Sequence, residues 1–451
     1  MTGSVSSAVA WPKWEDSAFY VQTTEAIHAS IGAQRRAAPV CWYESPALTT
    51  GVWVLSKWEH VRYVENNPQL FCNRYGFLIG DALRPETVID QLPEWAQTEL
   101  RKPGLTPAQT RGLIARGKLS LGDPELENMI FLDPPRHGQV RDIFMKALRP
   151  SLVRSLRPKI AELTDAFLDE IEPGAEVDFV RTVGRIPATL MTELIGVPRE
   201  MREEFIAMAS AHLEAITVTA DKDPAEVERI RRMEARFHEY STELLAARRA
   251  SGSAGDDLIS VIAQSELDGG PVPRGLALVF ITHFISAGET TRDMLSFFAQ
   301  AMAEHPDQRR LLVERPELIP NAIEETLRCF PDGWSQCRTA TQRVEIADQV
   351  IEEGDYVMGV FASANRDEDV YERVDEFDVT RRFDHDHLGF GHGEHACPGA
   401  LLTRVDAAVI IERLLARFPD WELAGAPQRW ATPFLQGMKS LPLVFSGRGH
   451  A

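Results

Sequence analysis

The stretch that decides the fold runs His387-Leu-Gly-Phe-Gly-His-Gly-Glu-His-Ala-Cys-Pro-Gly-Ala-Leu-Leu-Thr-Arg404. Its three glycines, at 389, 391 and 393, predict a loop that can adopt positive φ and let another group approach its backbone closely. Cys397 follows, and a helical pattern then places Leu401, Val405, Ala408 and Ile411 on one side. Pro398 suits the first helical position, so Cys397 should lie at a helix N-terminus, where the partial positive charge favours a thiolate. A thiolate in a glycine-lined loop is either a nucleophile or a metal ligand.

Cys397 also has a purely structural interpretation, because free cysteines are mostly buried as small apolar side chains. The flanking pattern Phe-Gly-x-Gly-x-His-x-Cys-x-Gly, at Phe390 through Gly399, is long and specific. It resembles the haem-thiolate loop of the cytochrome P-450 family, in which a cysteine thiolate ligates the haem iron. The resemblance implies that Cys397 is the proximal iron ligand and that the Phe390 ring packs beneath it. It also implies that His395 and His387 donate hydrogen bonds to the haem propionates.

Glu325 and Arg328 are three residues apart and share a face of the predicted helix 319–329. Taken alone, such a pair is usually a solvated surface ion pair. Here it resembles the Glu-x-x-Arg signature of the same family, a buried clamp that also uses an arginine from a later meander. Ala364-Asn-Arg-Asp367 followed by Phe377-Asp-Val-Thr-Arg-Arg382 resembles that meander, with Arg381 as the third member of the clamp.

Further basic residues match the positions that bind the haem carboxylates in this family. His137 and Arg141 are four apart, so both can point at one anionic group, and arginine suits bidentate carboxylate binding. Each alone could be a solvated base. Their segment resembles the family's helix that crosses the haem edge, and Arg338 occupies the place of another propionate-binding arginine. Together they would give the two haem carboxylates a full set of partners.

The segment Ile285-Ser-Ala-Gly-Glu-Thr-Thr291 places an acid and two hydroxyls inside the most apolar predicted helix. A local cap or helix kink is the structural interpretation. The segment is also similar to the family's oxygen-activation motif, (Ala/Gly)-Gly-x-(Asp/Glu)-Thr, which makes Glu289 and Thr290 an acid–alcohol pair that relays protons into a dry pocket. It departs from the motif at Ser286 and Ala287, and Ser286 could bond toward oxygen or toward substrate.

The resemblance also implies which residues face the substrate. Three-to-four spacing puts Thr282, Ile285 and Ser286 on the helical face of Glu289 and Thr290. The other expected pocket walls are Trp334, Phe434 and Leu435. Apolar walls with one or two hydroxyls predict a hydrophobic small-molecule substrate.

The expected organisation is a single domain over residues 1–451, with an N-terminal extension of about residues 1–20. A long variable region over about 78–130 would normally roof the pocket, and its extra length could make a lid, a dimer contact or a surface loop. His283 lies beside the expected pocket face. A lone histidine on an apolar helix is usually a satisfied core residue, and we expect the same of His283.

Composition excludes several classes of protein. Of 451 residues, 44% are hydrophobic and 25% charged, which is typical of a globular chain. A net charge of −19 argues against nucleic acid or an anionic membrane surface as the main partner. The N-terminus lacks a basic, apolar signal pattern, and five cysteines are too few for a disulfide scaffold, so we expect a cytoplasmic protein. The remaining cysteines, expected to be structural, are Cys41, Cys72, Cys329 and Cys337.

Apolar periodicity predicts mainly helix with a minor sheet. The predicted helices are Pro158–Glu172, Arg199–Thr217, Pro224–Ala250, Arg274–Ala303 and Ile319–Cys329. The predicted strands are Val52–Leu55, Val344–Ile346, Tyr356–Phe361 and Leu441–Phe445. The fold class is therefore mainly α with small β-sheets (α+β), and the resemblance implies the cytochrome P-450 fold with a long central helix over the haem.

The resemblance, which covers about residues 133–443, implies a soluble, bacterial-type monooxygenase with haem b ligated by Cys397. Such an enzyme would insert one atom of O2 into a hydrophobic small molecule, by hydroxylation or oxidative O-demethylation. The chain has no dinucleotide-type glycine fingerprint or cysteine cluster, so electrons should come from a separate ferredoxin and ferredoxin reductase. A peroxide-driven peroxygenase and a non-catalytic haem-thiolate sensor are the alternatives. The Glu289–Thr290 pair counts against the first, and an open apolar pocket would count against the second.

Residues 134–160 depart from the acidic balance of the chain, with seven basic residues and one acidic residue. In the family this stretch lies on the side of the haem where electrons enter. We therefore expect an acidic ferredoxin to dock there, attracted locally despite the acidic whole.

Overall fold

The fold is described by a computed structural model that covers residues 11–119, 126–216, 224–252, 255–430, 432 and 435–447. Helices dominate and the strands are short, which confirms the predicted fold class. The helices are α1 (Thr24–Ala37), α2 (Trp58–Asn66), α3 (Pro85–Val88), α4 (Glu94–Leu100), α5 (Pro107–Leu119), α6 (Arg136–Lys146), α7 (Pro150–Ser155), α8 (Arg157–Asp169), α9 (Arg185–Ile195), α10 (Arg202–Ile216), α11 (Pro224–Ser251), α12 (Leu258–Gln264), α13 (Arg274–Glu304), α14 (Pro306–Glu314), α15 (Ile319–Cys329), α16 (Phe361–Ala364) and α17 (Ala400–Arg417). The strands are β1 (Val40–Tyr43), β2 (Val52–Leu55), β3 (Phe71–Cys72), β4 (Glu176–Asp178), β5 (Glu266–Leu267), β6 (Gly270–Pro271), β7 (Ser335–Ala340), β8 (Val344–Ile346), β9 (Gln349–Ile351), β10 (Tyr356–Val360), β11 (Trp421–Leu423), β12 (Gln428–Arg429), β13 (Met438–Ser440) and β14 (Pro442–Phe445).

The predicted elements agree with these bounds to within a few residues. Helix α15 and strands β2 and β8 match at both ends, and α13 extends one residue beyond its predicted end. The helix expected over 199–217 instead begins with a 3-10 turn at Arg199–Met201, and residue 217 lies outside the described residues. Strong apolar periodicity therefore located the main elements correctly.

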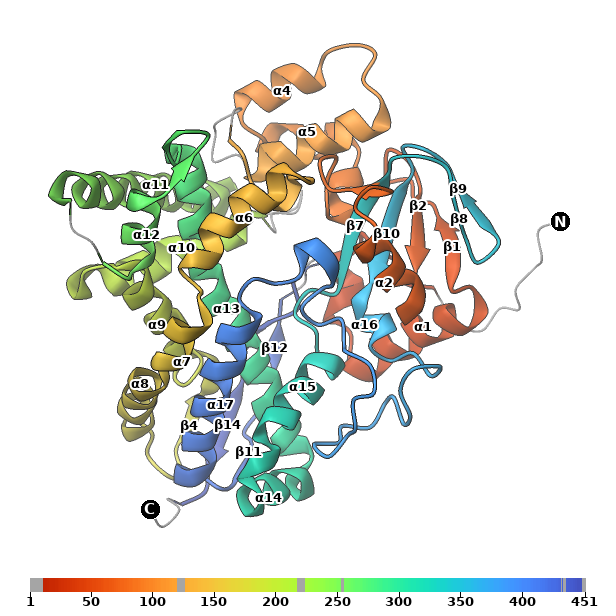
Figure 1. Cartoon of the computed structure of the whole chain (residues 1–451). Helices are drawn as coiled ribbons and strands as arrows, with labels where there is room; N and C mark the ends of the chain where they lie inside the picture. The colour runs from red at the N-terminus through yellow and green to blue at the C-terminus, as the bar shows by residue number, and fades with distance from the viewer. Residues whose placement is uncertain are drawn as a thin grey trace.

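Helix α13 runs through the centre of the helical part of the molecule (Figure 1). Its 31 residues are largely apolar and most of them are buried, as expected for a helix enclosed by other helices. Helix α9 packs against it at Gly288, where an added Cβ would lie 2.7 Å from the Cα of Ala188. The glycine therefore permits the close contact between these two helices. The largest apolar core surrounds α13 and includes side chains of α9, α15 and α17.

A five-stranded sheet lies on the opposite side of the molecule from α8–α12 (Figure 1). Its strand order is β1-β2-β10-β7-β3, with Met358 of β10 opposite Val54 of the parallel β2 and Cys337 of the antiparallel β7. Smaller sheets have the orders β11-β14-β4, β12-β13, β5-β6 and β8-β9. Strand β7 contains Arg338, which belongs to the basic cluster described below.

The described part of the segment 78–130 forms an outer helical layer, seen at the top of Figure 1 as α4 and α5. Ile114 of α5 packs with Leu92 in a small apolar cluster of its own. Within the described residues of this segment, Met129 and Ile130 line the cavity that contains Cys397, whereas α4 and α5 do not. The helix pair therefore lies outside the cavity wall instead of forming it.

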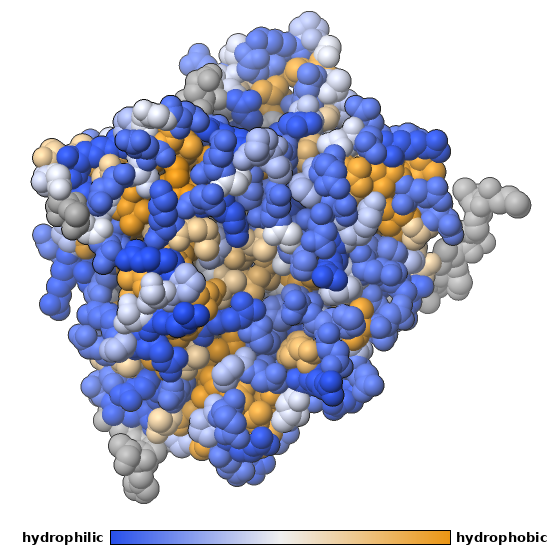
Figure 2. Space-filling view, in the orientation of Figure 1, coloured by the Kyte–Doolittle hydropathy of each residue, from blue (hydrophilic) through white to orange (hydrophobic). Residues whose placement is uncertain are grey.

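The face shown in Figure 2 is mostly hydrophilic, and its apolar side chains form separate patches. Among the described residues, no helix combines the length and apolar character needed to cross a bilayer. Even α13, the longest helix, carries acidic and basic residues in its second half.

Candidate active site

Cys397 lies in the loop before α17 and lines a cavity of about 290 Å³. Its backbone N–H donates to the carbonyl oxygen of Phe390 at 2.8 Å, which closes the loop. Gly391 and Gly393 adopt φ angles of 67° and 68°, so two of the predicted glycines use the left-handed region. A Cβ on Gly393 would overlap the carbonyl oxygen of Glu65, so the loop packs directly on α2.

The helix after the cysteine begins later than predicted. Gly399 is its N-cap and the first helical residue is Ala400, so the expected position of Pro398 at the start of the helix is wrong. Desolvation raises the pKa of the Cys397 thiol, although the Gly399 N–H and the charge of Arg141 act in the opposite direction. The protein alone therefore favours the thiol, and a cation bound to the sulfur would be needed to favour the thiolate.

A basic cluster lies beside this loop. It consists of His137 and Arg141 from α6, Arg338 from β7, and His395 from the loop itself. The rings of His137 and His395 are 4.0 Å apart between centroids, and the Nε2 atom of each is buried without a hydrogen-bond partner. Burial, together with the neighbouring arginine charges, lowers the pKa of His137 to about 4 and that of His395 to about 2. Buried donors and positive charges in one place require an anion, so the cluster fits a ligand that carries carboxylates.

The two arginines of the basic cluster also have partners within the chain. Arg338 Nη2 donates to Glu65 Oε2 at 2.6 Å, and both side chains are buried. Glu65 Oε1 has no partner, and burial raises the pKa of Glu65. Arg141 donates to the carbonyl oxygen of Ala396 at 2.6 Å, which ties α6 to the cysteine loop. Sequence reasoning missed Glu65, because nothing in the pattern of α2 separates it from a surface acid.

His387 does not join the basic cluster, contrary to the predicted propionate role. Its Nε2 lies 3.0 Å from Glu324 Oε2, and its Nδ1 accepts the N–H of Gly389 at 3.0 Å. Burial acts to raise the pKa of Glu324, but hydrogen bonds from Arg404 and His387 lower it to about 2. His387 thus links the cysteine loop to α15. Phe390 lines the cavity next to Cys397, with the Arg404 guanidinium 4.7 Å from its ring centroid.

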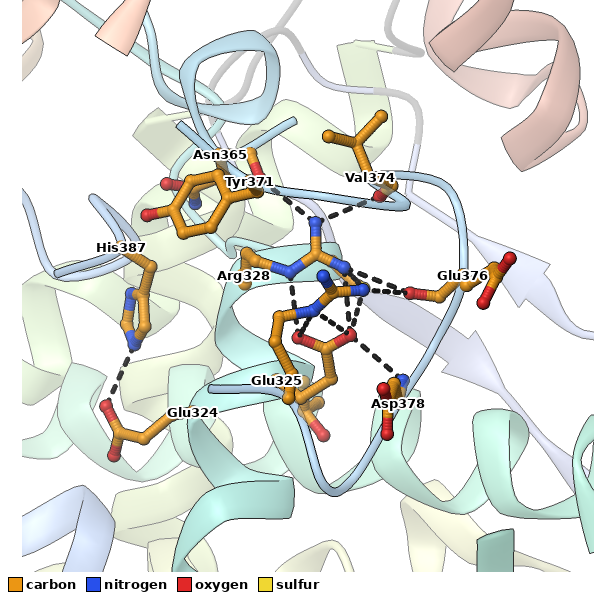
Figure 3. A network of polar contacts seen from close by, with 12 residues as sticks. Glu324, Glu325, Arg328, Asn365, Tyr371, Val374, Glu376, Asp378 and His387 are labelled. Carbon is orange, nitrogen blue, oxygen red and sulfur yellow. Dashed lines mark hydrogen bonds and ion pairs between the residues drawn. The ribbon is translucent and has the colours of Figure 1, made fainter. Parts of the chain in front are cut away.

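Glu325 and Arg328 lie at the centre of a buried polar network (Figure 3), and Arg381 pairs with the same Glu325 carboxylate. Arg328 donates to both carboxylate oxygens of Glu325 at 2.8 and 2.9 Å. Arg381 Nε reaches the same two oxygens at 3.0 and 2.9 Å. The remaining guanidinium donors bind meander carbonyls, including those of Val374 and Glu376. The clamp therefore fixes the meander against α15. The cysteine loop follows the meander directly in the sequence, so its start is fixed as well.

Helix α13 presents two neighbouring stripes to two cavities. The stripe toward Cys397 is made of the α13 residues that line its cavity, which are His283, Phe284, Ser286, Ala287, Thr290 and Met294. The stripe toward a second cavity, of about 500 Å³, includes Glu289, Arg292 and Asp293. Thr290 lines both cavities, so it lies where the two spaces adjoin along the helix.

Glu289 and Thr290 are adjacent in sequence but have different partners. Arg292 Nη1 pairs with Glu289 Oε2, and Ser210 Oγ donates to Glu289 Oε1 at 3.3 Å. Thr290 Oγ1 donates to the carbonyl oxygen of Ala287 at 3.3 Å, near the long limit for a hydroxyl hydrogen bond. The acid is thus held in the second cavity, while the hydroxyl of Thr290 is weakly held at the boundary.

The predicted pocket residues divide into two groups. Ser286 and Leu435 line the cavity that contains Cys397. Thr282 and Ile285 are not among its lining residues, because they lie on the stripe of Glu289, about 100° around the helix axis. The predicted pocket face was therefore displaced by one residue along the helix.

Trp334 also does not line the cavity. Its ring stacks on His28 at 5.6 Å and meets the Tyr20 ring edge-on at 5.9 Å, within the apolar core that packs on the five-stranded sheet. The predicted wall residue Phe434 lies outside the described residues. His283, expected to be a core residue, instead lines the cavity, as do Asp332 and Gln336, which the sequence analysis did not identify. A signal was present, since these last two flank Trp334 and precede Arg338.

Comparison with known proteins places these features in a family. Residues 109–435 match the family model described as Cytochrome P450. Cytochrome P450 107B1 of Saccharopolyspora erythraea is 31% identical over 398 residues, which are 87% of this chain and 88% of that protein. Linalool 8-monooxygenase of Pseudomonas putida is 30% identical over 424 residues, which are 94% and 96% of the two chains. The structure of P450 EryK with erythromycin B is similar with a TM-score of 0.74 and 27% identity, covering 94% of this chain and 97% of that one.

Proposed function

The chain belongs to the cytochrome P450 family, and from this we propose that Cys397 binds the haem iron of a monooxygenase that oxidises hydrophobic small molecules. The family makes the chain an oxidoreductase with haem as its cofactor. One observation carries the assignment of residues: Cys397 and Thr290 line the same cavity from opposite elements, the cysteine loop and α13. The proposed reactions are hydroxylation or oxidative O-demethylation.

The basic cluster supports a specific seat for the haem carboxylates. His137 and His395 each have a buried Nε2 atom without a partner, and Arg338 and Arg141 surround them with positive charge. Anionic ligands satisfy such donors best when several converge. These four residues would therefore hold the two carboxylates, and Phe390 would lie against the macrocycle beside Cys397. When bound, the haem supplies the iron at which O2 is activated for transfer of one oxygen atom.

Glu289 and Thr290 are proposed to move protons toward the reacting centre. The second cavity extends from Glu289 to Arg181, whose side chain is 80% exposed, so it connects the buried acid with solvent. Thr290 lines this cavity and also the one that contains Cys397. A carboxylate on the solvent side and a hydroxyl at the boundary can pass a proton from one space to the other. The surrounding apolar wall, including Phe284 and Met294, excludes bulk water and suits an apolar substrate.

Electrons are proposed to come from a separate ferredoxin and its reductase. Helix α6 supports this, because it contacts the cysteine loop through Arg141 and ends at the exposed Lys146. Arg154 of α7 is also exposed, and in the described part of the chain neither Lys146 nor Arg154 forms an ion pair. These cations lie close to the haem side of the chain and are available to an acidic partner.

The test is the absorption spectrum of the reduced carbon monoxide complex. The wild-type protein should show the red-shifted haem-thiolate band, and Cys397→His should lose it. Cys41→Ser is the matched control, because Cys41 lies in β1, its sulfur accepts a hydrogen bond from Gln34, and it does not line the cavity. A normal band in the Cys397→His protein would refute the ligand assignment.

A further inference from the structure

Asp332 lies in the short link between α15 and β7 and lines the cavity that contains Cys397. Its backbone is fixed by contacts with residues 435 and 436. The Asp332 carbonyl oxygen accepts the N–H of Gln436 at 2.8 Å, and Gly333 forms an antiparallel bridge with Leu435. The side chain is therefore presented to the cavity from a fixed segment.

The carboxyl group of Asp332 lacks a partner in the described chain. Its Oδ1 atom is shielded from solvent and has no hydrogen bond, and the side chain forms no ion pair among the described residues. A carboxylate in desolvated surroundings is costly unless it is paired. Proteins tolerate such groups mainly where function uses them.

The arginine whose charge acts on Asp332 is already paired with other carboxylates. Arg292 binds Asp293 through Nε and Nη2 at 3.0 and 3.1 Å, and its Nη1 pairs with Glu289. This region therefore holds three carboxyl groups for one arginine, and Asp332 is the one left without contact. Burial raises the pKa of Asp332 well above its ordinary value, the charge of Asp293 raises it further, and Arg292 only partly opposes them.

Asp332 is the one carboxyl group among the described residues that line this cavity, and two other polar side chains of the wall already have hydrogen-bond partners. Ser286 Oγ donates to the Thr282 carbonyl oxygen at 2.8 Å, and Gln336 Oε1 accepts from Arg338 at 3.1 Å. The wall around them is mostly apolar, with Phe144, Met191, Phe284 and Met294 among its members. A ligand that carried one cation on an apolar body would match both features.

We infer that Asp332 is a specificity site that recognises a positively charged nitrogen group on an otherwise apolar substrate. The inference rests on the proposed function, because it places that substrate in the cavity lined by Cys397 and Thr290. Asp332 is also close enough to Cys397 for its charge to act on the thiol, so a ligand held by this carboxyl would lie near the reacting centre. The positive charge of the ligand would pair with the Asp332 carboxylate, which Arg292 does not contact.

The test compares two probes that differ in one charge. These are (4-phenylbutyl)trimethylammonium and its neutral isostere, in which carbon replaces nitrogen; neither has a nitrogen lone pair that could coordinate iron. Their dissociation constants are measured on the haem-loaded protein by equilibrium dialysis. The wild-type protein should bind the cation at least tenfold more tightly, and Asp332→Asn should reduce the ratio to about one. Asp348→Asn is the matched control, since Asp348 is exposed on the β8–β9 turn, where asparagine tolerates its φ of 60°.

A second measurement separates recognition from a structural role. Because Asp332 has no partner to lose, Asp332→Asn should leave the thermal midpoint unchanged or raise it, whereas a structural carboxylate would lower it. A wild-type ratio near one, or an unchanged ratio in Asp332→Asn, would each overturn the inference. Both probes bind without turnover, so these results are independent of the Cys397→His spectrum. A failure of the cation site at Asp332 is thus distinguishable from a failure of the proposed function.

Discussion

At the residue scale, Thr290 connects the two cavities, and this position makes a sharp prediction. Thr290→Ala should keep substrate binding but divert reducing equivalents into hydrogen peroxide, because the boundary loses the hydroxyl that moves protons between the two spaces. Coupling of NADH consumption to product should fall severalfold in the reconstituted system. The quantities to measure are product, peroxide and NADH consumed.

The neighbouring threonine provides the control. Thr291 Oγ1 donates to the Ala287 carbonyl oxygen at 2.8 Å, meets Thr403 at 3.2 Å and lines neither cavity. Thr291→Ala should therefore remain coupled. Tightly coupled turnover in Thr290→Ala, or equal uncoupling in both variants, would remove Thr290 from the proton path.

Asp406 of α17 makes a prediction about pH. It is 1% exposed, its Oδ1 has no hydrogen bond, and burial raises its pKa to about 7. Because the folded-state pKa lies above the unfolded value, the stabilising effect of the neutral acid is complete below about pH 4 and is lost as pH rises to about 7. Asp406→Asn should therefore raise the free energy of unfolding at pH 8 by up to about 4 kcal/mol, and change it little at pH 4.

Urea unfolding at the two pH values measures this difference. Glu412→Gln on the same helix is the comparison, because the Glu412 side chain is 57% exposed and its exposed pair with Arg157 should contribute little to stability. An Asp406→Asn protein that is less stable than wild type at pH 8 would show that the carboxylate has an unrecognised partner.

At the element scale, Gly288 controls how closely α9 and α13 approach. In an isolated helix alanine is more stable than glycine by about 1 kcal/mol. Here an added Cβ would lie 2.7 Å from Ala188 Cα and 2.9 Å from its nitrogen, so backbone must move. Gly288→Ala should therefore lower stability by about 1–3 kcal/mol, the reverse of the intrinsic preference. Gly138→Ala in α6 is the control, because no atom lies within 4 Å of the added Cβ and the variant should be neutral or stabilised. Thermal unfolding of both variants decides the sign.

The sequence predicts the bounds of such helices better than it predicts which face of each helix points toward the site. The bounds of α13 and α15 follow from apolar periodicity, which local sequence contains. Which stripe of α13 faces the cysteine loop depends on the helices around it. Because α13 is apolar nearly all round, the sequence pattern does not show a rotation of one residue about the helix axis. Thr282 and Ile285 were therefore assigned to the wall of the cavity that contains Cys397, which they do not line.

The polar sites show the same limit for single contacts. The residues of the Glu325 clamp are recognisable because their spacing and order are specific, and the structure brings all three together. Glu65 and Asp332 carry no local motif. The position of Glu65 beside Arg338 and that of Asp332 in the cavity wall therefore emerge only from tertiary packing. His387 matched a plausible position, but its partner Glu324 comes from another element and decides where the ring points.

At the scale of the whole molecule, charge is unevenly distributed. The net charge is −19, yet residues 134–160 contain seven basic residues and one acidic residue. This stretch forms α6, α7 and the start of α8; α7 and α8 lie on the side of the molecule away from the five-stranded sheet, and α6 lies nearer the centre (Figure 1). Several of its cations are neutralised, for example Arg136 by Glu127 and Arg149 by Asp256. Lys146 and Arg154 are exposed and form no ion pair among the described residues, so they are the best candidates in this stretch to attract an acidic electron donor.

Reversing both of these charges tests the docking surface. Lys146→Glu with Arg154→Glu should slow reduction of the haem by an acidic ferredoxin about tenfold at low ionic strength, and should weaken the dependence of that rate on salt. Stopped-flow reduction over a range of salt concentrations measures both effects. The control reverses Arg36 and Arg343, whose side chains are 61% and 70% exposed on α1 and beside β8, and it changes the net charge equally. If general repulsion controlled the rate, both double variants would slow reduction to the same extent. Slowing confined to Lys146 and Arg154 would show that the partner binds at α6 and α7, where Arg141 connects the surface to the cysteine loop.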